Sequence, residues 1–125
     1  MLNEAFGWLW VVMGFASGTL LGMKFQGEQW LGGYGSHPRR LIRLGHISFF
    51  GLGILNILFA HSLERIHLSP ILFMLASRSL ILGALTMPVC CGLMAWKREF
   101  QPLFIVPVLS LLIGGVLTFL GLVIP

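Results

Sequence analysis

The sequence predicts an all-α integral membrane protein, a four-helix up-down bundle that forms one domain over residues 1–125. The chain is 57% hydrophobic and only 10% charged, with a mean hydropathy of +0.93. A soluble domain usually carries about 25% charged residues, so this chain lacks the charge to cover a water-facing surface. Its apolar residues also fall into runs of about 20, the length that crosses roughly 30 Å of hydrocarbon. We therefore expect four spans in contact with the lipid bilayer, over residues 5–23, 41–63, 71–96 and 103–124.

The first span carries glycines at four-residue spacing, at Gly14, Gly18 and Gly22. Glycines at this spacing make a flat surface that another helix backbone can approach closely. We expect a helix contact there, with contact to a flat cofactor as the alternative. The N-terminus carries Glu4 and lacks the basic region of a secretory signal, so we expect this span to be retained.

The third span has a clear start and an interruption. Ser69 followed by Pro70 is a helix-start signal, because serine caps the first turn and proline suits the first helical position. Pro88 lies well inside the span and should kink the helix and leave one backbone carbonyl without its helical partner. Cys90 and Cys91 are adjacent, and neighbours on a helix point about 100° apart. We expect these cysteines to pack as small residues and not to form a disulfide.

The basic residues predict the orientation of the chain in the membrane. They gather in the first and third connections, whereas the second connection carries only Arg65. An excess of Lys and Arg marks cytoplasmic loops. We therefore expect the first and third connections in the cytoplasm, both termini outside, and a bacterial inner membrane as the location. This bias also accounts for the net charge of +4, so nucleic-acid binding is not expected.

The second span carries His46 and His61, one near each end. At about 1.5 Å rise per residue they lie roughly 22 Å apart along the helix axis. At about 100° per residue their directions differ by about 60°, and Phe50, Gly53 and Ile57 lie between them on that side. Ionisable groups inside a membrane helix are costly, which makes both histidines functional candidates.

The pattern His46-x14-His61 resembles the ligand helices of the cytochrome b family, which carries two b haems across a bilayer. The resemblance covers the two histidines and the small residue Gly53 between them. It implies haem b as cofactor, His46 and His61 as axial metal ligands, and Gly53 as the place where a flat macrocycle approaches. This chain has one such helix where the family supplies two.

The second axial ligands could come from three sources. A two-fold axis could bring the second span against its copy, so that each histidine faces its mate. His37 and His67 could instead serve as the second ligands within one chain, or another subunit could supply them. Haem propionates favour cations and hydrogen-bond donors. The candidate propionate partners are Arg43 and Arg40 at the inner layer and Arg78 and Ser79 at the outer layer. An ion pair between Arg78 and Glu64 is the plainer role for those two residues.

The expected function is that of a b-type haem subunit that moves electrons within a respiratory-type membrane complex, as a homo-oligomer or with other membrane subunits. A quinone or a cytochrome would then be its redox partner. The main alternative is a cofactor-free accessory subunit that packs within a larger complex. A chlorophyll-type pigment, which needs one axial ligand, is a further alternative. Hydrolysis is not expected, because the sequence has neither a Ser/His/Asp set nor an HExxH motif.

Overall fold

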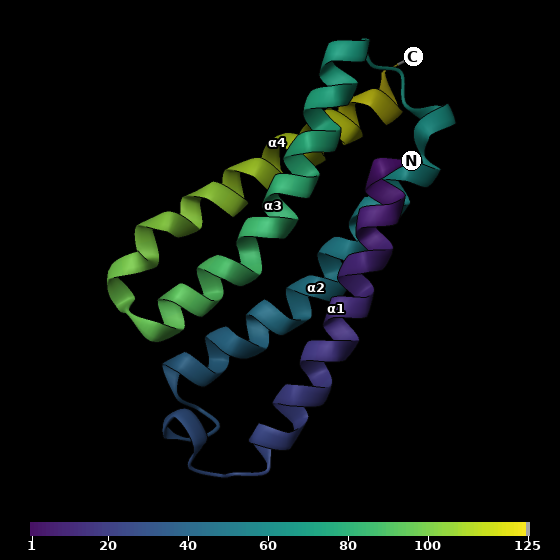
Figure 1. Ribbon diagram of the computed structural model, residues 1–125. Helices are drawn as coiled ribbons and strands as arrows, with labels where there is room; N and C mark the ends of the chain where they lie inside the picture. The colour runs from purple at the N-terminus through teal and green to yellow at the C-terminus, as the bar shows by residue number, and fades with distance from the viewer. Residues whose placement is uncertain (125) are drawn as a thin grey trace.

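The computed structural model describes residues 1–124, which form four long helices joined by short connections that contain 3₁₀ turns (Figure 1). The start of the first helix and the end of the last helix lie at one end of the molecule, and the first and third connections lie at the other. Each of the four helices is long and apolar enough to cross a membrane, the last one together with the turn before it. The predicted all-α, four-span architecture is confirmed, and the chain is an integral membrane protein. The elements are α1 (Leu2–Phe25), η1 (Trp30–Gly32), α2 (His37–His61), η2 (Leu63–Arg65), α3 (Pro70–Trp96), η3 (Arg98–Phe104) and α4 (Ile105–Val123).

Serine caps fix the starts of α2 and α3. The Ser69 hydroxyl accepts a hydrogen bond from the Leu72 amide at 3.4 Å, which confirms the predicted helix start. The Ser36 hydroxyl accepts from the Arg39 amide at 3.3 Å in the same way. The second helix therefore begins at His37, one turn earlier than its apolar run, because the cap and not hydrophobicity sets its start.

Each helix packs chiefly against the next helix along the chain. A buried cluster of Phe59, Ala76 and Leu80 joins α2 to α3 near the connection between them, and Leu111 of α4 packs against it. Glycines let α3 and α4 approach each other: a Cβ on Gly114 would lie 2.8 Å from the Leu80 side chain. Large apolar side chains cover much of the outer surface, as expected for helices that face lipid.

The glycine face of α1 packs against α2, as the spacing predicted. A Cβ on Gly14 would lie 2.8 Å from the Phe50 ring, and a Cβ on Gly18 would lie 2.9 Å from the His46 ring. Gly22 has no such neighbour within 4 Å, so the contact ends before it. The expected helix contact is confirmed for Gly14 and Gly18.

Pro88 frees a backbone carbonyl of α3, as predicted. Because proline has no amide hydrogen, the carbonyl of Ala84, four residues earlier, lacks its helical donor. The Trp10 indole Nε1 donates a hydrogen bond to this carbonyl at 3.0 Å. The proline thus creates an acceptor in α3 that holds α1 in place.

A buried arginine organises the first connection. Arg39 is 3% exposed, and its guanidinium donates to the carbonyls of Phe25, Gly27 and Glu28 at 3.0–3.3 Å. The guanidinium carbon also lies 4.6 Å from the centre of the Phe25 ring. Since Phe25 ends α1, Arg39 of α2 caps the C-terminus of α1, where a cation is favoured.

Candidate functional site

His46 lies between α1 and α2 and is partly buried. Its Nδ1 is 3.1 Å from the Ser17 hydroxyl oxygen, and its ring meets the Phe50 ring edge to face at 5.5 Å. A Cβ on Gly18 would lie 2.9 Å from Cε1 and 3.3 Å from Nε2 of the imidazole, so a side chain there would collide with the ring. Two residues of α1 therefore position this imidazole, one by a hydrogen bond and one by the absence of a side chain.

The Ser17 hydroxyl links the backbone of α1 to the imidazole of His46. A serine hydroxyl has one proton to donate, and Ser17 donates it to the Gly14 carbonyl at 3.1 Å. In the tautomer that fits this bond, Nδ1 carries the proton and the Ser17 oxygen accepts it. In the neutral imidazole this leaves a lone pair on Nε2, which has no hydrogen-bond partner in the part of the chain described and is not sealed from the surface.

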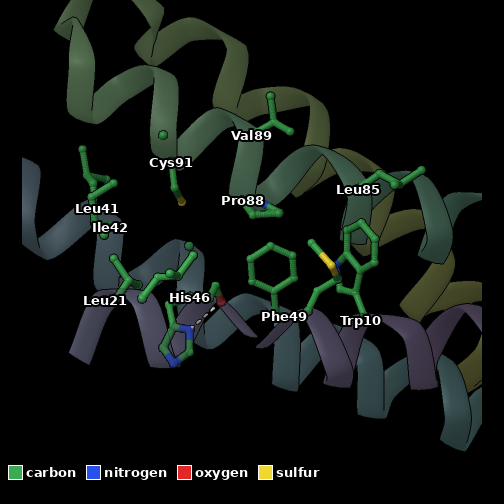
Figure 2. A pocket seen from close by; sticks show the side chains of 15 residues that line it. Trp10, Leu21, Leu41, Ile42, His46, Phe49, Leu85, Pro88, Val89 and Cys91 are labelled. Carbon is green, nitrogen blue, oxygen red and sulfur yellow. Dashed lines mark hydrogen bonds between the residues drawn. The ribbon is translucent and has the colours of Figure 1, made fainter. Parts of the chain in front are cut away.

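A cavity of about 490 Å³ adjoins this pair, between α1, α2 and α3. Figure 2 shows Pro88 and Cys91 of α3 on one side of it and Phe49 and His46 of α2 on the other, with Trp10 of α1 at one end. The walls are almost entirely apolar, and Ser17 and His46 are their main polar side chains. Exposed residues of α1 and α3 line its margin, so the cavity opens sideways toward the lipid.

His61 does not share this site. It is the last residue of α2, it is exposed, and its side chain makes no described hydrogen bond or ring contact. The chain thus brings one histidine into the helix packing and leaves the other at the end of the bundle. Within residues 1–124, no group of three or more His, Cys, Asp or Glu side chains is placed to hold a metal ion.

Gly53 is part of the contact between α1 and α2. A Cβ there would lie 2.8 Å from the Gly7 carbonyl oxygen and 3.1 Å from Cβ of Trp10. The backbone of α1 therefore fills the space where a macrocycle was expected. The histidine-bearing side of α2 faces α1, so a second copy of α2 does not reach His46 from that side.

The two candidate arginines lie in different surroundings. Arg43 donates to the Tyr34 carbonyl at 3.0 Å, and its guanidinium lies 4.1 Å from the centre of the Tyr34 ring. It therefore holds the first connection. Arg78 lies on α3, and both it and Glu64 are exposed with no described side-chain hydrogen bond, so the expected ion pair between them is not formed.

A buried polar cluster across three helices was not anticipated from the sequence. Asn3 of α1 donates to the Asn56 side-chain oxygen of α2 at 2.8 Å and to the Ser77 carbonyl of α3 at 3.2 Å. The Ser77 hydroxyl donates back to Asn3. Both asparagines are fully buried. Asn56 inside an apolar run was the available signal, because an amide in a membrane helix needs a partner.

Cys90 and Cys91 are buried and free, in agreement with their expected packing role. Comparison of the chain with protein-family models, with curated proteins and with solved structures finds no match.

Proposed function

We propose that this chain is a subunit of a membrane electron-transfer complex that binds a b-type haem through Nε2 of His46. The observation that carries the proposal is the Ser17–His46 hydrogen bond. Histidines that ligate metals almost always donate their other ring N–H to an acceptor, which fixes the tautomer and the ring orientation. A bound b haem would supply one-electron chemistry.

The chain would supply one axial ligand for each haem. His61 lies at the far end of α2 and cannot be the second ligand of a haem on His46. Another subunit or a second copy of the chain would supply that ligand, and a haem on His61 would need one as well. This requirement supports a place within an oligomer or a respiratory-type assembly, with a quinone or a cytochrome as redox partner. By the distribution of Lys and Arg, the end that bears Lys24 and Arg98 would face the cytoplasm of a bacterial cell.

The test is an absorbance spectrum of the purified, detergent-solubilised protein, oxidised and reduced, with haem counted per chain. Haem binding predicts a Soret band and a sharp reduced α-band, both lost in His46→Ala. Ser17→Ala removes the hydroxyl that contacts Nδ1, together with its bond to the Gly14 carbonyl, and should weaken haem retention by about 10- to 100-fold. His61→Ala, on the same helix, is the matched control and should keep the His46 haem. A red band of a chlorophyll-type pigment would identify the other one-ligand cofactor.

The second candidate is a cofactor-free accessory subunit. The filled space at Gly53 favours it, because α1 and α2 pack together there with no room for a macrocycle. Under this hypothesis the native assembly is colourless and His46→Ala leaves its spectrum and its composition unchanged. A bulky residue at Gly14, in contrast, should break the packing of α1 on α2 and with it the assembly.

A further inference from the structure

A second hollow, of about 890 Å³, lies between the first half of α2 and the hairpin of α3 and α4. Its walls are apolar over most of their length, and its polar residues come from the turn η3. The apolar lining residues include Leu41, Leu44, Met94, Phe104, Ile105 and Val108. The polar lining residues are Arg98, Glu99 and Gln101. The hollow is therefore amphipathic, with its charged part at the end of the bundle opposite the chain termini (Figure 1).

One arginine lines this charged end, and a second, Arg40, lies outside the lining on the turn of α2 next to Leu41 and Leu44. Arg98 is the first residue of η3 and lines the hollow directly. Arg40 lies one turn before Leu44 on the same face of α2, and helical side chains lean toward the N-terminus. Both arginines are exposed, and neither side chain makes a described hydrogen bond, in contrast to Arg39 and Arg43. Glu99 is the one acidic residue in the lining.

We propose that this hollow binds an anionic phospholipid, with its phosphate on Arg40 and Arg98 and an acyl chain along the apolar wall formed by α2 and α4. Basic pockets between membrane helices attract anionic lipid headgroups, and guanidinium groups pair with phosphate oxygens. A small soluble anion has no apolar part that could contact this wall, so the wall favours a ligand with an acyl chain. Glu99 favours a phosphodiester with a single charge over a headgroup with several charges.

The binding test compares phosphatidylglycerol with phosphatidylcholine of the same acyl chains, by titration into the purified protein and native mass spectrometry. The wild-type protein should retain phosphatidylglycerol in preference to phosphatidylcholine. Each cation near an anionic membrane surface contributes about fivefold to affinity, so Arg40→Gln with Arg98→Gln should weaken phosphatidylglycerol binding about thirtyfold. Phosphatidylcholine binding should change little.

A charge-matched control separates a site from diffuse attraction. Lys24→Gln with Lys97→Gln removes two positive charges from the same end of the bundle, and neither lysine lines the hollow. Diffuse attraction predicts equal losses for the two double variants, and that result would overturn the proposal. Equal retention of the two lipids by the wild-type protein would overturn it as well.

The apolar wall has its own test. Val108→Gln places an amide where the acyl chain would lie and should weaken phosphatidylglycerol binding while both arginines remain. Glycerol phosphate without acyl chains should not compete for the site, and effective competition would show a soluble anion site instead. If the double arginine variant does not fold, Arg98→Gln alone carries the test, with an expected loss of about fivefold.

Discussion

Alanine at Gly7 should loosen the contact between α1 and α2 measurably. The added Cβ would lie 2.5 Å from the Gly53 carbonyl oxygen and 2.6 Å from Cγ1 of Ile57, where ordinary contacts are 3.4–4 Å. Because one of these neighbours is backbone, α1 has to move away by most of an ångström. Overpacking of this kind costs about 1–3 kcal/mol, and the Gly→Ala gain in helix propensity returns about 0.5–1 kcal/mol. We expect a net loss of about 1–2 kcal/mol in the free energy of unfolding.

Gly22→Ala is the matched control, since it lies on the same helix with nothing within 4 Å of its added Cβ. It should be neutral or stabilise by up to about 1 kcal/mol. Equilibrium unfolding in mixed micelles, followed by circular dichroism and by tryptophan fluorescence, measures both variants. Equal stability of Gly7→Ala and Gly22→Ala would show that α1 does not pack on α2 as described.

Three further substitutions test single contacts in the same unfolding assay. Trp10→Phe keeps the ring and removes the donor to the Ala84 carbonyl, so we expect a loss of about 1–3 kcal/mol, and an unchanged stability would contradict that bond. Asn56→Ala removes the acceptor of Asn3 and should cost about 1–2 kcal/mol, with an unaltered value arguing against the buried cluster. Arg39→Lys loses the planar fork that reaches three carbonyls, so proteolysis between residues 26 and 36 should become faster, and an unchanged cleavage rate would refute the cap.

The four helices could be predicted from the sequence because the lengths of their hydrophobic runs match the thickness of a bilayer. The contact face of α1 could also be predicted, since the glycine spacing depends only on helix geometry. The effect of Pro88 was predictable for the same reason, as the lost donor is a local property of proline. Which residue supplies the replacement donor was not predictable, because Trp10 comes from a helix more than 70 residues away in sequence.

Two features escaped sequence reasoning because they depend on the arrangement of distant segments. Arg39 looked like one more loop charge, but the first connection folds around it. That fold needs a left-handed backbone at Leu31 (φ 53°) and at the two glycines that follow. Asn3 lies before the apolar run of the first span, so a hydropathy argument excluded it from the bundle. The structure buries it because Asn56 and Ser77 need partners at that depth.

The different fates of the two histidines follow from the length and direction of α1. The two helices are antiparallel, so Gly18 faces His46, Gly14 faces Phe50 and Gly7 faces Ile57. Following this register, the position opposite His61 falls at the first residues of α1, where the helix begins. The face of α1 that positions His46 therefore does not extend past His61, and no residue of α1 packs beyond that level.

A haem on His46 would use an imidazole that Ser17 and Gly18 of this chain already position and would take its second ligand from a partner, whereas a haem on His61 would need a partner chain for its whole environment. The haem count per chain distinguishes these arrangements. One haem that persists in His61→Ala supports a site at His46 whose second ligand comes from a partner. Two haems, one lost in each histidine variant, would show that a partner completes the outer site. That outcome would restore the two-level arrangement suggested by the spacing of the histidines.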